Sequence, residues 1–184
     1  NANPNGKEAF DGFVADHILR TCATVKEARV VLDRFSVGLP QGQLLFGDRT
    51  GDSMVVEAGD VIISKKGNHQ VITNFKISQM PNGGDKCARF KKVDTMFSGA
   101  ESVSIDMARD ALQAVGLKPS PDGLEKRIPG TQYSIVFDLT HLELHVYRSF
   151  DFERPIRMDV RKELSRGARA VRLADFVPDA PTNP

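Results

Sequence analysis

Short connections between β-prone runs constrain the fold of this chain more than any other feature of its sequence. The runs are Gln43 to Phe46, Ser53 to Glu57, Val61 to Ser64 and Gln70 to Thr73. Turn-forming and charged residues fill the short segments between them. Because a parallel pair of strands needs a crossover of about a dozen residues or more, neighbouring runs must pair in antiparallel fashion. The sequence therefore predicts an antiparallel meander that ends at Thr73, Asn74 and Phe75.

Two helices are predicted before this meander. Apolar residues recur at helical spacing between Phe10 and Leu19, which indicates a helix with one apolar face. Thr24 and Glu27 have the spacing of a capping box, in which each side chain bonds the backbone N–H of the other residue. This pair predicts the start of a second helix, which ends before Gly38.

A loop over Pro81 to Asp85 separates the meander from further helices and a second block of strands. The predicted elements are helices near Cys87 to Phe97 and over Ser104 to Val115, strands over Tyr133 to Leu139, Leu142 to Val146 and Arg154 to Met158, and a short helix over Val160 to Arg166. Gly116 is expected to end the second of these helices, and Thr140 and His141 to form the turn of a hairpin. Since strands and helices come in blocks, we expect an α+β fold with helices packed on antiparallel sheets.

The composition is that of an ordinary folded domain. The chain has 184 residues, of which 40% are apolar and 27% are charged. We expect a single domain over residues 1–184, with a loop at 1–9 and a frayed tail at 179–184. No run approaches the roughly 20 apolar residues of a membrane span. The net charge of +1 creates no general attraction to nucleic acid or anionic membrane. These features do not indicate a cellular compartment for the protein.

Several kinds of site are not supported by the sequence. The glycine patterns of phosphate-binding and dinucleotide-binding loops are absent, as is the Gly-x-Ser-x-Gly motif of α/β hydrolases. His141 and His145 are four residues apart, but on a strand this spacing is about 13 Å and does not suit a shared metal. We therefore expect no cofactor and no metal. Cys22 and Cys87 are predicted to be core thiols, although one disulfide between them is compatible with the sequence.

The meander and the helix after it carry a recognisable series of motifs. Asp48, Gly51 and Ser53 form an Asp-x-x-Gly-x-Ser turn and strand that ends in Glu57. Thr73-Asn74 follows, and then Cys87-Ala88-Arg89-Phe90 at the start of a helix. In this order the motifs resemble the N-terminal-nucleophile hydrolases. The closest resemblance is to the linear amide group of choloylglycine hydrolases and penicillin acylases or acyltransferases. Since the helix at Thr24 and the strand from Thr131 to Asp138 also fit, the resemblance covers nearly all of the chain.

The resemblance implies a four-layer αββα sandwich and a catalytic cysteine at the start of the mature polypeptide, whose own α-amine acts as the base. Asn1 cannot take that role, so the nucleophile is expected in a missing N-terminal segment or a companion chain. Asn74 matches the family asparagine that donates to the oxyanion, and Arg89 matches the arginine near the nucleophile. Asp48, Ser53 and Glu57 are expected to order the turn.

The expected function is therefore hydrolysis or acyl transfer on a small linear non-peptide amide through a thioester, with this chain inactive by itself. Phe75 and Lys76 depart from the pattern of bile-salt and penicillin V enzymes, so a more general amide is expected. One alternative is a non-catalytic binding or structural domain of the same fold. Another is an assembly protein that forms homo-oligomers through exposed strand edges.

Overall fold

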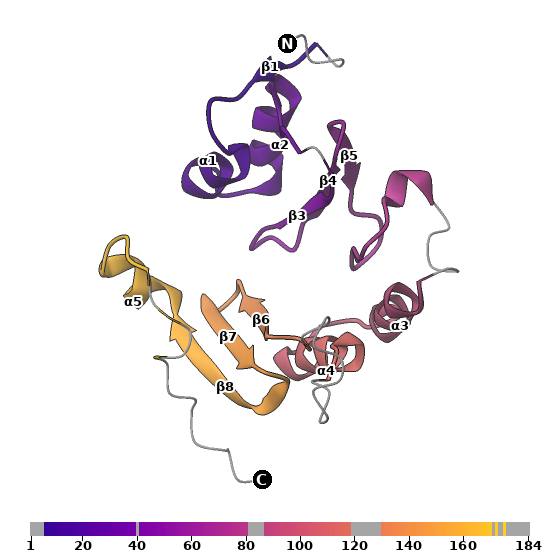
Figure 1. Ribbon diagram of the computed structural model, residues 1–184, viewed down its shortest axis with the longest axis vertical. Coiled ribbons are helices and arrows are strands. Elements are labelled where there is room, and N and C mark those ends of the chain that lie inside the picture. Colours follow the sequence, from indigo (N-terminus) through magenta and orange to yellow (C-terminus); the bar gives the residue numbers. More distant parts are fainter. Residues whose placement is uncertain are drawn as a thin grey trace. The chain divides into compact units, whose positions relative to one another are not determined.

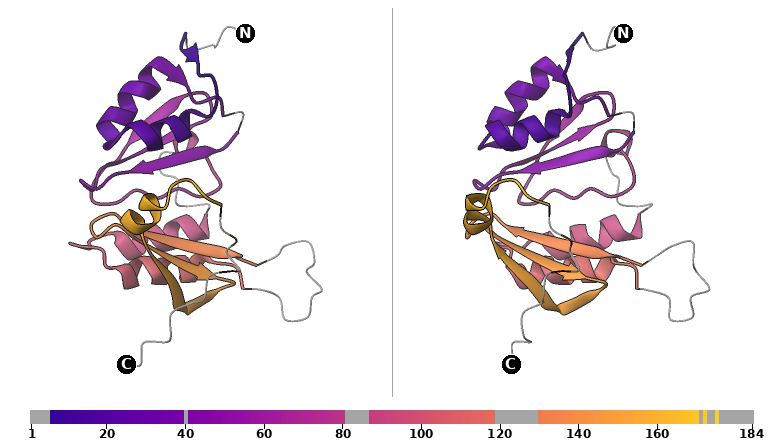
Figure 2. Two further views of the ribbon diagram at one scale, coloured as in Figure 1. Left: turned by 90° about the vertical axis from the view of Figure 1, so that its left-hand side faces the viewer. Right: turned by 60° about the vertical axis from the view of Figure 1, so that its left-hand side comes forward.

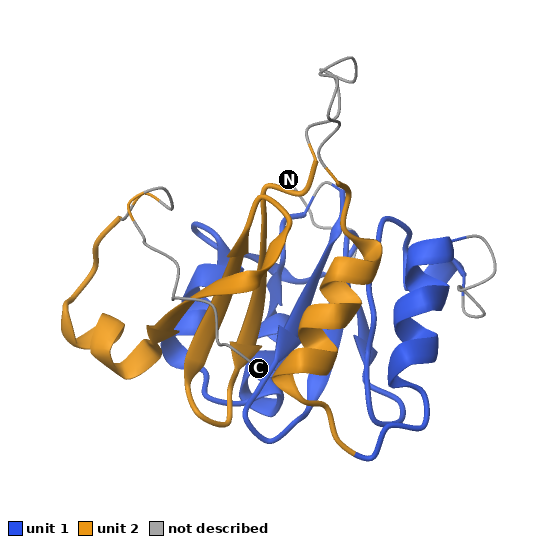
Figure 3. Ribbon diagram, turned by 90° about the horizontal axis from the view of Figure 1, so that it is seen from below, with its two compact units in different colours: residues 1–101 blue, residues 102–184 orange. Residues whose placement is uncertain are grey.

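A computed structural model describes residues 6–39, 41–80, 87–118, 130–170, 172 and 175. The protein has a mixed α+β fold with antiparallel sheets, as the sequence predicts (Figure 1). It divides into two compact units, residues 1–101 and 102–184 (Figure 3). The single domain expected from the sequence stays a prediction. The loop predicted over Pro81 to Asp85 and the tail over 179–184 lie outside the described residues.

Two helices open the first unit. α1 spans Val14–Thr21 and α2 spans Val25–Arg34. The predicted start of the first helix near Phe10 is wrong, because Gly12 has φ +105°, a conformation that no α-helix contains. The capping box is confirmed: Thr24 Oγ1 accepts from the Glu27 N–H, and the Glu27 carboxylate accepts from the Thr24 N–H.

The loop expected over residues 1–9 contains a short strand. β1, Glu8–Ala9, pairs in parallel with β2, Phe35–Ser36, which directly follows α2. Together α1 and α2 supply the long crossover that a parallel pair requires. The prediction of a loop is therefore wrong at Glu8 and Ala9, while residues 1–5 lie outside the described part.

The sheet of the first unit has three antiparallel strands in the order β3-β4-β5. They span Gln43–Gly47, Ser53–Glu57 and Val61–Ser64, close to the predicted bounds. Figure 2 shows α1 and α2 along one face of this sheet. The core between them contains Val14, Ile18, Val25, Ala28, Leu32, Val37, Met54 and Val56. Burial of these apolar side chains is the main force that holds the helices on the sheet.

The fourth predicted strand, Gln70 to Thr73, does not form. The sheet ends with β5, and the chain continues as an irregular segment to the 3₁₀ helix η1, Ile77–Gln79. Its backbone is held by side chains rather than by a strand ladder, as described below. Asn74 consequently lies in an irregular segment and not at a strand end. Beyond residues 81–86, α3 spans Ala88–Phe97.

The second unit contains a helix and a three-stranded antiparallel sheet in the order β6-β7-β8. The elements are α4 (Ile105–Val115), β6 (Tyr133–Asp138), β7 (Glu143–Arg148), β8 (Asp151–Asp159) and α5 (Val160–Ser165). The predicted hairpin, the additional strand and the short final helix are all confirmed. Val136, Tyr147 and Phe152 form the centre of a core that α4 covers with Ile105, Ala108 and Leu112.

Gly116 ends α4 as predicted, but for a different reason from the usual left-handed glycine. Its φ is −66°, which any residue can adopt. A Cβ atom at this position would lie 2.8 Å from the ring of Phe150. Glycine is therefore needed here because an aromatic ring packs against the backbone.

No helix in the described part of the chain is both long and apolar enough to cross a membrane.

Candidate functional site

Asn74 and Arg89, the two residues expected to carry the chemistry, are in direct contact. A terminal nitrogen of Arg89 donates to Asn74 Oδ1 at 2.7 Å, although the residues are 15 positions apart in the chain. Arg89 lies in the first turn of α3, and both side chains are exposed. Because Oδ1 is engaged by the guanidinium, the NH₂ group of Asn74 is directed away from it and keeps its two donors for another partner.

The backbone on both sides of Asn74 is held by Gln43, the first residue of β3. Its Nε2 donates to the carbonyl of Phe75 at 3.2 Å and also to the carbonyl of Thr73. Gln43 Oε1 is buried and has no hydrogen-bond partner among the described residues. A side chain thus replaces the strand ladder that the sequence predicted at this point. The sequence gave no reason to single out Gln43, since a glutamine at a strand start carries no recognisable signal.

Glu57 holds the next part of the same segment. This residue is completely buried at the end of β4, and its carboxylate accepts from the backbone N–H groups of Ile77 and Ser78 and from the Ser78 hydroxyl. Lys76 Nζ donates to the carbonyl of Ala58 at 3.1 Å. A buried carboxylate is tolerated only where donors satisfy it, and η1 supplies them. Glu57 thus has a structural role, but it orders η1 and not the turn between β3 and β4 that the sequence predicted.

Asp48 orders the turn between β3 and β4 and ties it to α2. It accepts from the Thr50 N–H and hydroxyl and, at 2.6 Å, from the N–H of Val25. Burial works to raise the pKa of Asp48. The Thr50 hydroxyl and the backbone N–H groups of Val25, Thr50 and Asp52 outweigh this effect and hold the pKa below its ordinary value. The Ser53 hydroxyl donates to Gln70 Oε1 at 2.7 Å, so its role is structural but it holds the irregular segment and not the turn.

Cys87 lies beside the Asn74–Arg89 pair. It is the N-cap residue of α3, and its Sγ is 3.4 Å from Thr73 Oγ1. The Thr73 hydroxyl lowers the pKa of the Cys87 thiol, as do the N–H of Phe90 and the charge of Arg89, against an opposing effect of burial. The side chain is partly exposed, and neither cysteine forms a disulfide. Cys22 is partly buried and packs against the core of the first unit, which agrees with the prediction of a core thiol. Cys87 is also partly buried but lies at the start of α3 and belongs to neither core, so the prediction is wrong for this residue.

The other end of α3 is attached to the same irregular segment. His69 Nε2 lies 2.9 Å from Asp94 Oδ1, and Asn68 Nδ2 donates to the carbonyl of Ala100 at 2.8 Å. The ring of His69 also contacts Phe97, with centroids 6.0 Å apart. His69 thus joins the segment to the C-terminal part of α3.

The result is a compact group of three chemical functions in the first unit: an amide donor, a guanidinium and a polarised thiol. The sequence identified Asn74 and Arg89 through a resemblance but missed Cys87. The signal that could have found it is its place at a predicted helix start with an arginine two residues later, a setting that favours a thiolate. Phe75 and Phe90, which follow Asn74 and Arg89 in the chain, pack against each other with ring centroids 5.3 Å apart.

Comparison of the chain with models of protein families, with curated proteins and with solved structures finds no match.

Proposed function

We propose that this chain is the larger, C-terminal portion of an amidase-type hydrolase or acyltransferase that acts on a linear non-peptide amide. In this proposal the two antiparallel sheets belong to an αββα sandwich of the N-terminal-nucleophile type. The nucleophile is an N-terminal cysteine outside residues 1–184, which forms a thioester with the acyl group. Asn74 and Arg89 then act on the negative charge that develops during attack.

The hydrogen bond between Arg89 and Asn74 carries the proposal. Amide hydrolysis passes through a tetrahedral intermediate whose oxygen bears a negative charge, and preorganised donors aimed at that oxygen lower the barrier by about 3 to 4 kcal/mol each. Arg89 occupies the acceptor of the Asn74 amide, so the donor end is the end presented outward. Gln43 and Glu57 fix the backbone that carries it, which limits the reorganisation needed when charge appears.

A second candidate is favoured by the contact between Thr73 and Cys87. A thiol whose pKa is lowered at a helix N-terminus can itself act as the nucleophile in acyl transfer. In that case Cys87 would form the thioester, and Asn74 would be the adjacent oxyanion donor. The two candidates share a reaction type and differ in the cysteine that is acylated.

The deciding experiment begins with the N-terminal residue and intact mass of the native protein. The native protein is then incubated with para-nitroanilides of several aliphatic and aryl-acetic acids, and the acyl-enzyme is trapped in acid and mapped by peptide mass spectrometry. Acylation of an N-terminal cysteine supports the leading proposal. Acylation of Cys87 supports the second candidate. No acylation and no turnover across the panel would favour a non-catalytic domain.

Variants test the assigned roles. Asn74→Ala is expected to lower kcat by about a hundredfold to a thousandfold with a smaller effect on KM, as for loss of one oxyanion donor. Arg89→Ala should also lower kcat. Lys91→Ala removes a second exposed cation from α3, two positions further along and therefore on another face. An equal loss in Lys91→Ala and Arg89→Ala would overturn the role given to Arg89.

A further inference from the structure

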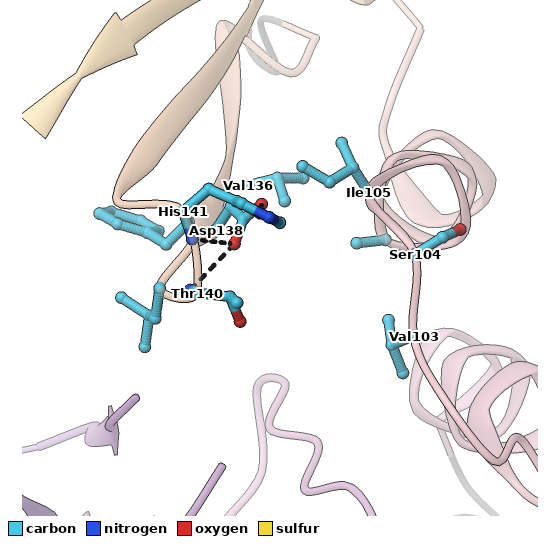
Figure 4. Close-up of a pocket in the computed structure, with 10 residues that line it drawn as sticks. Val103, Ser104, Ile105, Val136, Asp138, Thr140 and His141 are labelled. Carbon is cyan, nitrogen blue, oxygen red and sulfur yellow. Dashed lines mark hydrogen bonds and ion pairs between the residues drawn. The ribbon is translucent and has the colours of Figure 1, made fainter. Parts of the chain in front are cut away.

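A cavity in the second unit is independent of the group around Asn74. It has a volume of about 510 Å³ and lies between the start of α4 and the end of β6 with the turn that follows. Figure 4 shows Val103, Ser104 and Ile105 on one wall and Val136 with Asp138, Thr140 and His141 on the other. Ala108, Phe137 and Leu139 complete the lining. This volume is within the usual range of small-molecule sites, roughly 300 to 1,000 Å³.

Six of the ten lining residues are apolar, and the protein's own packing covers them to different degrees. Val103 is 52% exposed, whereas Val136 is 9% exposed and belongs to the core against which Ile105 and Ala108 pack. Apolar side chains that gather around one concavity while remaining in contact with water mark a place where an apolar group gains free energy by binding. The lining therefore favours a ligand with a compact apolar body, such as an aryl ring or a short alkyl chain.

One polar pair at the edge of this cavity has a fixed orientation. Asp138 Oδ2 is 2.7 Å from His141 Nδ1, and its Oδ1 accepts from the N–H groups of Thr140 and His141. The His141 N–H and ring hold the pKa of Asp138 below its ordinary value, so the carboxylate stays ionised. Since an ionised carboxylate only accepts, Nδ1 carries a proton and Nε2 is the atom left to meet a ligand.

We propose that this cavity binds a small ligand with an apolar body and one O–H or N–H group, which donates to His141 Nε2. The apolar body lies against Val103, Ile105 and Val136, and the donor end lies at the turn between β6 and β7. An alcohol or an N-substituted amide has this chemistry. The inference does not depend on the proposed amidase activity, because no residue of the Asn74 group takes part.

The test uses a matched pair of probes on the full chain. Phenylbutanol has the apolar body and the donor, and its methyl ether has a similar shape without the donor. Binding is followed through amide-resolved NMR spectra at about pH 8, where a histidine ring is ordinarily neutral and its free nitrogen accepts. Saturable shifts at the lining residues are expected for both probes, with the alcohol bound about fivefold more tightly. Equal affinities for alcohol and ether would overturn the role of His141.

Two variants separate the apolar and polar contributions. His141→Ala should weaken the alcohol to the affinity of the ether and leave the ether unchanged. Val103→Asp should weaken both probes by about tenfold, because a carboxylate replaces part of the apolar wall. Val30→Asp is the control, since Val30 is 69% exposed on α2 in the other unit. Equal effects of Val103→Asp and Val30→Asp, or shifts that never saturate, would overturn the site. Val103→Thr, which keeps the shape of the side chain, repeats the test if Val103→Asp does not fold.

Discussion

The two units use their sheets in different ways. In the first unit, two side chains of the sheet hold the irregular segment that contains Asn74. Gln43, at the start of β3, donates to the carbonyls on both sides of Asn74, and Glu57, at the end of β4, accepts from the start of η1. In the second unit, the strands continue through tight turns, and Val136, Tyr147 and Phe152 pack against α4. Order in the irregular segment around Asn74 thus depends on a few polar contacts, whereas order in the second unit depends on apolar packing.

The comparison predicts its largest effect at the core of the second unit. Phe152 is 3% exposed and its ring contacts both Tyr147 and Phe150. Phe152→Ala should lower the free energy of unfolding by about 4 kcal/mol, through lost burial and the cavity it leaves. Hydrogen exchange should rise in β6 to β8. If exchange instead rises mainly between residues 70 and 80, the distinction between the units fails.

A smaller effect is expected from the polar contacts of the first unit. Glu57→Ala leaves the N–H groups of Ile77 and Ser78 without their acceptor, which should cost about 2 kcal/mol in urea unfolding. Its main signature should be local, with faster exchange at Ile77 to Gln79. Gln43→Ala should cost about 1 kcal/mol and loosen the backbone around Asn74. Glu57→Gln keeps the size of the side chain and one acceptor, so it should fall between wild type and Glu57→Ala.

Lowering the pH tests the stabilising role of one carboxylate in each unit, Asp48 in the first and Asp138 in the second. The pKa values of Asp48 and Asp138 lie below the ordinary value, so each ionised group stabilises the folded state above the pH at which it would titrate in the unfolded chain. This stabilisation is lost as the pH falls through the lower, folded-state pKa, in the range of about pH 4 and below. In Asp48→Asn and Asp138→Asn, the free energy of unfolding should each time fall less steeply as the pH is lowered, as measured by urea unfolding. Asp16→Asn, which removes an exposed carboxylate of α1, is the matched control.

The smallest expected effect concerns the two thiols. Cys87 should be alkylated several-fold faster than Cys22 at neutral pH, because its pKa is lowered by Thr73 and the start of α3. Thr73→Val should slow the alkylation of Cys87 and leave Cys22 unchanged. Peptide mass spectrometry after a brief iodoacetamide pulse reports both rates in one sample. Equal rates for the two cysteines would remove the basis for the second functional candidate.

Much of the fold follows from the sequence because its signals are local. The capping box of Thr24 and Glu27, the bounds of β4 and β5, and the hairpin of β6 and β7 all depend on residues a few positions apart. Such contacts form at the same spacing in any protein, so a pattern is enough to predict them. The same reasoning failed at Gln70 to Thr73, where a β-prone run meets side chains from distant strands instead of a neighbouring strand.

The sequence by itself determined the α+β class and most helices and strands, and it led to the expectation that Asn74 and Arg89 share a site. Only the tertiary structure decided that these two side chains touch, that Gln43 and Glu57 hold the backbone beside Asn74, and that Cys87 shares the group. The physical reason is separation along the chain. These contacts join residues 14 to 32 positions apart, and their formation depends on how whole elements pack, which no local pattern encodes.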